Sequence, residues 1–271
     1  MSDLQARLLE MMVWFDNYCT KNKLRYYIIG GTLLGAMRHG GFIPWDDDLD
    51  IGIPREDYNK LRKIFINDGR FKLEMPESDA KDFCYGYGKL YDTTTTLIEE
   101  RRINVKRGLF IDIFPIDGIG NDLVEAKSRY KKIKLYYGLL VARTASIRKG
   151  RSLIKNLFTL ASRVIPNFIF PIRDLRMRID SEISRYDFDK SQYAGNLLGL
   201  KMEREIVPKD YFGIPQDVLF EGHSLKMPAQ PDNYLKHIYG NWKKMPPKEK
   251  QITHHDFLLC DLNVPYIEHT F

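Results

Sequence analysis

Residues 30–51 have the sequence GGTLLGAMRHGGFIPWDDDLDI, in which a glycine pair precedes four aspartates within five positions. Clustered like charges disfavour a strand unless something positive lies among the carboxylates. Side chains alternate along a strand, so Asp48 and Asp50 are expected to share one face while Leu49 points into the core. Neighbouring carboxylates at a strand end are hard oxygen ligands suited to Mg²⁺ or Mn²⁺. The alternative is a surface acidic turn after Pro44.

The glycine pair is the second informative feature. Gly30 and Gly31 close an expected strand at 25–29 and open an expected helix at 32–39. Glycines leave backbone N–H groups accessible, and a helix N-terminus favours an anion. Glycine pairs are common in ordinary turns, but one followed shortly by an Asp-x-Asp strand is a specific combination. An anion-binding turn beside a metal site is therefore predicted.

A third acid is expected on an adjacent strand. Asp112 lies between Ile111 and Ile113 in an expected strand at 109–114. A carboxylate in such apolar surroundings is costly to bury without a cation nearby. Asp112 is therefore predicted to be a third metal ligand or a general base, and a structural hydrogen-bonding role is the alternative. Asp117, just after a proline, is predicted to lie in a turn.

Apolar periodicity, with breaks at glycine and proline, predicts an α/β (α+β) fold whose mixed sheet has flanking helices. Helices are expected at 4–19, 32–39, 58–65 and 232–239, and strands at 25–29, 48–53, 71–74, 84–91, 95–100 and 109–114. Residues 122–186 read as mostly helical, and the C-terminal stretch as loop-rich around its one helix. We expect three segments: an α/β core at 1–120, a basic helical region at 121–190, and a loop and helix segment at 191–271 that completes the core.

Composition excludes several classes of protein. The chain has 271 residues, of which 44% are hydrophobic and 29% charged, which excludes disorder, collagen and coiled-coil architectures. Three dispersed cysteines without a CxxC pair argue against a disulfide framework or cysteine zinc site and favour a reducing compartment. No signal-peptide pattern opens the chain, and no apolar run has the length of about 18–20 residues that spans a bilayer. A cytoplasmic protein is expected.

The charge is unevenly distributed. Residues 127–178 carry a net charge of +13, whereas the whole chain carries +6. Apolar and aromatic residues are interspersed at helical spacing between 154 and 170. This mixture is typical of a helix lying on an anionic membrane, here the inner face, or contacting an anionic glycolipid. A solvated face on a packed helix explains it equally well. Nucleic acid is disfavoured as a partner because no helix-turn-helix, RRM or finger signature is present.

Three blocks of the sequence resemble the LicD family, whose members have a nucleotidyltransferase fold. They are GTLLGAMRHGGFIPWDDDLD at 31–50, GLFIDIFPID at 108–117, and YGNW followed by MPP at 239–247. The family includes phosphocholine transferases of bacterial surface glycans and, more distantly, fukutin-type ribitol-phosphate transferases. The third block departs from the family's common Tyr-Gly-Asp-Tyr.

The resemblance implies that residues 1–120 form a nucleotidyltransferase-like catalytic core. The implied reaction transfers a phospho-alcohol, most commonly phosphocholine from CDP-choline, to a glycan or glycolipid hydroxyl and releases CMP. The acceptor would be a teichoic acid, capsule or lipopolysaccharide sugar. By the same resemblance, Asp48 and Asp50 bind the metal, Asp112 completes that site or takes the acceptor's proton, and Gly30, Gly31 and Thr32 hold the donor phosphate.

Cationic and aromatic side chains are further candidates. Arg38 and Lys89 are expected to assist phosphate transfer, with ordinary surface charge as the alternative, and Arg107 is a weaker candidate. The segment 254–256 (His-His-Asp) is a further candidate to reach the site. A quaternary ammonium needs aromatic faces. The aromatic residues near the motifs, each of which fits the core equally well, are Trp45, Tyr85, Tyr87, Tyr91 and Trp242.

Two other functions remain open. One is transfer of a nucleotide to a small alcohol with release of pyrophosphate, and within the favoured reaction CDP-ribitol or CDP-glycerol is an alternative donor. The other is a non-catalytic adaptor that docks on membrane through residues 127–178. Three costly acids argue against an adaptor, which has no need of them.

Overall fold

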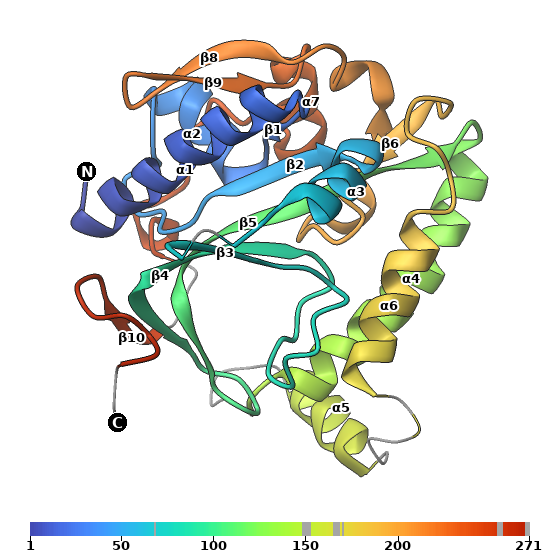
Figure 1. The fold of residues 1–271 in the computed structure, drawn as a ribbon. Helices are drawn as coiled ribbons and strands as arrows, with labels where there is room; N and C mark the ends of the chain where they lie inside the picture. Colours follow the sequence, from blue (N-terminus) through green and yellow to red (C-terminus); the bar gives the residue numbers. More distant parts are fainter. Residues whose placement is uncertain (68, 148–152, 165–168, 170, 254–256, 269–271) are drawn as a thin grey trace.

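The computed structural model describes residues 1–67, 69–147, 153–164, 169, 171–253 and 257–268 (Figure 1). Its helices are α1 (Asp3–Asn22), α2 (Gly30–His39), α3 (Arg55–Ile64), α4 (Leu123–Thr144), α5 (Leu153–Val164), α6 (Ile172–Ile183) and α7 (Pro231–Tyr239). Its strands are β1 (Tyr27–Ile28), β2 (Asp50–Pro54), β3 (Phe71–Glu74), β4 (Gly88–Glu99), β5 (Val105–Gly120), β6 (Tyr193–Gly195), β7 (Val207–Pro208), β8 (Gln216–Phe220), β9 (His223–Met227) and β10 (Phe257–Asp261).

The main sheet is mixed, which confirms the expected fold class. Its strand order is β1-β2-β5-β4-β10, with β3 also paired to β4, β6 to β5 and β7 to β6. Strands β2 and β5 run parallel, and the other described pairs of this sheet are antiparallel. The long strands β4 and β5 curl strongly (Figure 1), and their register shifts between Asp92 and Leu97. A register shift of this kind bends a strand pair.

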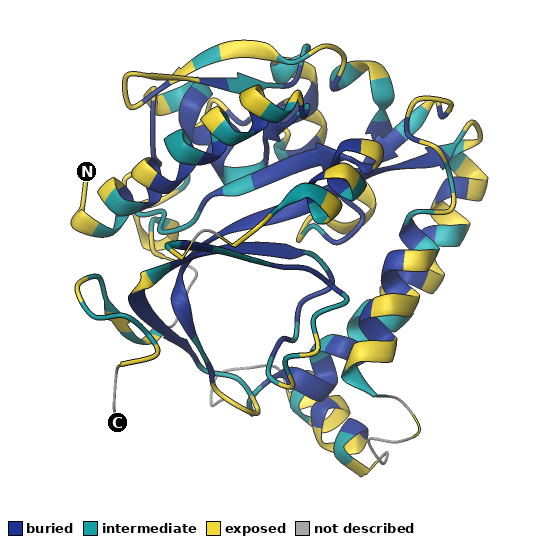
Figure 2. Ribbon diagram, in the orientation of Figure 1, coloured by how far each residue is buried: buried dark blue, intermediate teal, exposed yellow. Residues whose placement is uncertain are grey.

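The helices cover the sheet from two sides. Helices α1 and α2 lie on the side of β1 and β2, whereas α4 and α6 lie side by side along the other end of the molecule, with α5 at their far end (Figure 1). Strands β2 and β5 are almost entirely buried (Figure 2), and Leu49 is buried as the alternation predicts. In α1, the apolar residues spaced three and four positions apart form the buried face, as predicted.

A small hairpin supports the segment that leads to the acidic residues. Strands β8 and β9 form this separate hairpin, which packs against α2 and β1. At its turn, the Phe42 backbone N–H donates to the Glu221 carboxylate at 3.0 Å, and the Glu221 N–H donates to the Gly40 carbonyl at 2.9 Å. The hairpin thereby holds the turn that ends α2. The sequence reading missed this hairpin and β10, having assigned the C-terminal stretch to loops around one helix.

Two further strand predictions need correction. The expected strands at 84–91 and 95–100 are one strand, β4, because its pairing with β5 continues through the register shift. Strand β2 begins at Asp50, so Asp48 lies before the strand and the alternation argument does not apply to it. The preceding residues follow a turn in which the Asp46 N–H donates to the Ile43 carbonyl at 2.8 Å.

Asp117 does not lie in a turn, contrary to the prediction. It is a fully buried residue of β5. Arg55 donates to its two carboxylate oxygens from Nε at 2.6 Å and from Nη2 at 2.8 Å. A bidentate guanidinium stabilises a buried carboxylate, which explains why the strand continues through this position.

Candidate active site

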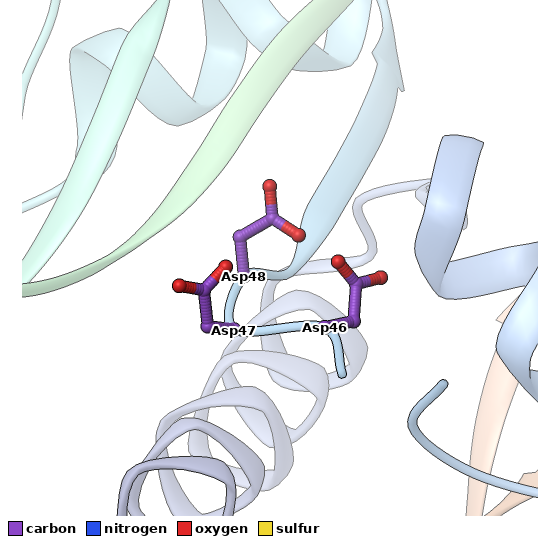
Figure 3. Close-up of side chains that lie close together, drawn as sticks. All are labelled: Asp46, Asp47 and Asp48. Carbon is purple, nitrogen blue, oxygen red and sulfur yellow. The ribbon is translucent and has the colours of Figure 1, made fainter. Parts of the chain in front are cut away.

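Three consecutive carboxylates gather on the segment that enters β2 (Figure 3). One oxygen each of Asp46, Asp47 and Asp48 lies within 4.8 Å of the others, and all three residues are half-buried. The segment is held from two sides: Gln5 of α1 donates to the Asp46 carbonyl at 2.9 Å, and the Thr253 hydroxyl donates to the Asp47 carboxylate. Of these three aspartates, only Asp48 was predicted from the sequence to bind the metal.

A row of charged residues crosses the sheet next to this cluster. Asp50 of β2 is paired in register with Asp112 of β5, and Asp112 is paired with Lys89 of β4. Directly paired residues place their side chains on the same face. The Lys89 ammonium lies 2.6 Å from one Asp112 oxygen, and the Tyr87 hydroxyl donates to the other at 3.4 Å. The structure therefore brings together Asp50, Asp112 and Lys89, all three predicted from the sequence.

The Asp50 carboxyl group is unfavourable to ionise where it lies. Burial of its carboxyl, and then the charges of Asp48, Asp112 and Asp46, raise the pKa of Asp50 well above its ordinary value. A cation among these groups would remove that cost. Carboxylate oxygens are the ligands that Mg²⁺ and Mn²⁺ prefer. The residues of this site therefore fit a divalent metal ion.

The glycine pair lies directly against the acids. Gly30 has a φ of +56°, and a Cβ atom there would lie 2.8 Å from an Asp50 carboxylate oxygen. A Cβ atom on Gly31 would lie 2.9 Å from an Asp46 carboxylate oxygen. Only glycine allows the first turn of α2 to approach this closely. The N-cap residue Ile29 makes no side-chain cap, and N–H groups at the start of a helix favour an anion.

Thr32 has a second role besides the predicted one. It is buried, and its hydroxyl accepts a hydrogen bond of 2.8 Å from the Asp50 backbone N–H. This bond fixes the start of β2 against the first turn of α2. The predicted anion-binding turn and the predicted acid strand are therefore joined by a direct contact.

Replacing Gly30 with alanine tests this close approach. Gly40→Ala is the matched control, because Gly40 also has a left-handed φ, +71°, but no described heavy atom lies within 4 Å of the Cβ it would gain. Gly40→Ala is expected to cost about 1–2 kcal/mol of unfolding free energy from backbone strain alone. Gly30→Ala is expected to cost more, because its methyl group also meets Asp50. Urea unfolding measures both costs, and equal losses would contradict the account.

The hydrogen bonds described for the predicted arginines go to residues other than the acids of the site. Arg38 donates from Nη1 to the Trp242 carbonyl at 3.2 Å and from Nε to His39 at 3.0 Å, so its described contacts join α2 to the C-terminal segment. Arg107 binds the Asp82 carboxylate with two hydrogen bonds of 2.7 Å and Glu74 with one of 3.0 Å. Its described ion pairs therefore join β5 to β3 and to the segment before β4. The predicted segment 254–256 lies outside the described residues.

The aromatic candidates are divided between core and site. Tyr91, Tyr85 and Trp242 are buried, and Trp45 and Tyr87 are half-buried. The Tyr87 ring packs on Phe114 at a centroid distance of 4.2 Å. Because its hydroxyl also reaches Asp112, Tyr87 is the candidate that the structure brings to the acids.

Two residues near Asp50 were not predicted. Glu205 ends a short 3₁₀ turn (Met202–Glu205) and is buried. Its charge and that of Asp50, after burial of the ring hydroxyl, raise the pKa of Tyr239. Tyr239 belongs to the third sequence block, which marks it as notable. Nothing in the local sequence MERE distinguishes Glu205 from its exposed neighbour Glu203.

Glu205 makes stability depend on pH. Burial raises its pKa to about 7. A carboxyl with a raised folded-state pKa contributes stability below its unfolded value of about 4.3, and this contribution is lost as pH rises through 7. Glu205→Gln is therefore expected to match the wild type near pH 4 and to exceed it at pH 8 by up to about 4 kcal/mol, at about 1.4 kcal/mol per pKa unit.

Urea unfolding at several pH values measures this difference. Glu203→Gln, at an exposed position of the same turn, is the control and should follow the wild type throughout. A Glu205→Gln profile parallel to the wild type would show that Glu205 is not the buried titrating group.

The mixed sheet, the glycine-pair helix start and the adjoining acids together define a nucleotidyltransferase-like fold. Residues 23–136 match the family model described as "LicD/FKTN/FKRP, nucleotidyltransferase domain". This match confirms the resemblance drawn from the sequence blocks at 31–50 and 108–117, which lie within the matched residues.

Several curated proteins are similar to this chain. Lipopolysaccharide cholinephosphotransferase LicD of Haemophilus influenzae is 26% identical over 258 residues, which is 93% of this chain and 94% of that protein. An uncharacterised protein of Rickettsia prowazekii is 39% identical over 85 residues, 31% of this chain and 28% of that protein. Human ribitol 5-phosphate transferase FKRP is 51% identical over 41 residues, 15% of this chain and 8% of its own.

Proposed function

We propose that this protein transfers a phospho-alcohol from a CDP-linked donor to a glycan hydroxyl and releases CMP. The observation that supports the proposal is the close approach of Gly30 to an Asp50 oxygen and of Gly31 to an Asp46 oxygen, so that an anion bound at the start of α2 would lie beside a metal ion bound by these acids. A diphosphate with its metal ion needs both features. Phosphocholine is the proposed group, because the relative similar over most of this chain is named a cholinephosphotransferase.

The acidic residues would hold the metal. Asp46, Asp47 and Asp48 supply three oxygens close together, and Asp50 adjoins them. A divalent ion bound there, Mg²⁺ or Mn²⁺, supplies charge neutralisation for the diphosphate and the leaving CMP. Backbone N–H groups at the start of α2 would bind a donor phosphate oxygen, and Thr32 would keep that helix start aligned with β2.

Asp112 is the proposed proton acceptor. It lies outside the group of three carboxylates, and its own ammonium partner is Lys89. Burial raises the pKa of Asp112, and the Lys89 charge lowers it. A carboxylate whose pKa is raised is a better base than an exposed one. The proton would leave the acceptor hydroxyl for Asp112 as that oxygen bonds to phosphorus and the bond to CMP breaks.

The half-buried ring of Tyr87, whose hydroxyl reaches Asp112, supports choline as the alcohol. Tyr87 is half-buried and packs between Tyr85, at a centroid distance of 5.8 Å, and Phe114 at 4.2 Å. A quaternary ammonium cannot donate ordinary hydrogen bonds and binds on aromatic faces. Ribitol and glycerol, whose hydroxyls need polar partners, would gain less from these rings.

Thermal unfolding with candidate donors tests the donor assignment. The ligands are CDP-choline, CDP-ribitol, CDP-glycerol and ATP, each with and without Mg²⁺. A ligand at 100 times its Kd adds about 2.7 kcal/mol of stability, a shift of several degrees for a chain of this size. We expect a magnesium-dependent shift with CDP-choline. A shift with another CDP-alcohol would change the donor, and a shift with ATP alone would favour nucleotidyl transfer.

A further inference from the structure

Helix α5 has the reverse of the usual burial pattern. Its large apolar residues are exposed, Leu153 by 86%, Leu157 by 67% and Val164 by 82%, while Thr159 and Ser162 are buried. At 3.6 residues per turn, the exposed apolar residues form one face and the two hydroxyl residues lie on the opposite face. A helix packed only to complete a soluble core would bury its apolar face instead.

The polar face of α5 is held by α4. Arg143 of α4 is almost fully buried and donates to the Ser162 carbonyl at 3.4 Å, and the Ser162 hydroxyl donates to the Thr159 carbonyl at 2.7 Å. This packing fixes α5 at the end of the α4 and α6 pair, where its outer side is exposed (Figure 2). The apolar face is therefore presented outward by specific contacts. An exposed apolar surface of this kind marks an interaction site.

The stretch of chain that contains α5 is strongly basic. Residues 127–178 carry a net charge of +13, and Arg143 at the end of α4 is a basic residue that contacts α5. A pocket beside the end of α4 is lined by the basic residues Lys81, Arg101, Arg102 and Arg143. The acid in that lining, Asp82, is bound by two hydrogen bonds of 2.7 Å to Arg107. The partner of this surface must therefore be apolar and negatively charged.

We propose that α5 lies on the surface of an anionic lipid bilayer, with its apolar face among the lipid chains and the basic residues around it at the lipid phosphates. This geometry is that of an interfacial amphipathic helix. Within the described parts of the chain no helix is both long and apolar enough to cross a membrane. A second copy of the chain is a poorer occupant, because it would bring the same basic residues against this surface. The proposal goes beyond the transfer reaction, no step of which requires a membrane.

Co-sedimentation of the full-length protein with vesicles tests the proposal. Vesicles of phosphatidylcholine with phosphatidylglycerol are compared with phosphatidylcholine alone, at low and high salt. We expect binding to the anionic vesicles that weakens with salt. The double substitution Leu153→Ser with Leu157→Ser is expected to weaken it about 10-fold or more, since both side chains lose their apolar burial. The control is Leu219→Ser on β8, equally exposed but distant in the fold.

The outcomes separate this proposal from the proposed function. Donor-induced thermal stabilisation should be the same in the α5 variant and the wild type, because α5 holds no residue of the acid site. Absence of binding to anionic vesicles, or equal binding by the α5 variant, would overturn the proposal. So would a wild-type dimer, seen by light scattering, that the α5 substitutions dissociate without any change in vesicle binding.

Discussion

Asp50→Asn is expected to abolish metal-dependent CMP release without destabilising the metal-free protein. The loss in kcat should be on the order of 10²–10³-fold or more, because removing one preorganised electrostatic group from an active site costs that much. The unfolding temperature without metal should equal or exceed that of the wild type. Both effects are measured on the same preparation, by CMP release and by thermal unfolding.

The two effects share one physical cause. Burial, together with the charges of Asp48, Asp112 and Asp46, raises the pKa of Asp50. Because the pKa of Asp50 is raised in the folded state, the unfolding free energy of the protein falls as pH rises. At neutral pH, the ionised form of Asp50 therefore destabilises the metal-free fold. Asparagine keeps the shape and removes the charge. A purely structural aspartate would show the opposite: a lower unfolding temperature and little loss of turnover.

Asp210→Asn provides the control, because Asp210 is an exposed acid in a C-terminal turn. It should leave activity and stability near the wild-type values. Mg²⁺ should raise the unfolding temperature of the wild type and of Asp210→Asn but not that of Asp50→Asn. Near-normal turnover by Asp50→Asn would remove Asp50 from the proposed metal site.

Lys89→Met is expected to lower stability by about 3–5 kcal/mol, because it leaves a buried carboxylate without its partner. Lys89 is 1% exposed, and its ammonium lies 2.6 Å from Asp112 and 3.1 Å from the centre of the Phe110 ring. Methionine fills the same space beside the aromatic ring. The loss therefore comes from the charge and not from a cavity. It should lower the unfolding temperature on the order of 10 °C.

A second substitution separates the charge effect from other causes. Adding Asp112→Asn to Lys89→Met removes the orphaned carboxylate and should restore part of the lost stability, a coupling that a double-mutant cycle measures. Lys72→Met is the control, since Lys72 is a more exposed lysine of the same sheet that pairs with Glu74 at 3.1 Å. It should change stability by less than about 1 kcal/mol. Additive effects of the Lys89 and Asp112 substitutions would contradict the proposed ion pair.

The sequence predicts the features of this fold that depend on local patterns. Periodicity places α1 and α2, and alternation predicts that Leu49 is buried. Pairings between distant segments cannot be predicted from the local sequence pattern. The bidentate contact of Arg55 with Asp117 spans 62 positions, so a buried strand residue was read as a turn.

The site residues likewise include some that local patterns predict and some that depend on long-range pairing. Gly30 and Asp50 were predicted as parts of one site, and a Cβ on Gly30 would lie 2.8 Å from an Asp50 oxygen. Lys89 was predicted to assist phosphate transfer, but its direct pairing with Asp112 depends on the register of β4 with β5. Glu205 was missed, because its burial results from the packing of segments that are far apart in sequence.

We infer that the acids beside the α2 glycine turn support metal-dependent transfer from a CDP-linked donor. The most direct test is to incubate the protein with CDP-choline, Mg²⁺ and a choline-free glycan extract, and to quantify CMP and pyrophosphate. We expect CMP release that requires Mg²⁺ and disappears in Asp50→Asn. Choline phosphate should appear on the glycan at the same time. Pyrophosphate release, or CMP release unaffected by chelator and by Asp50→Asn, would contradict this inference.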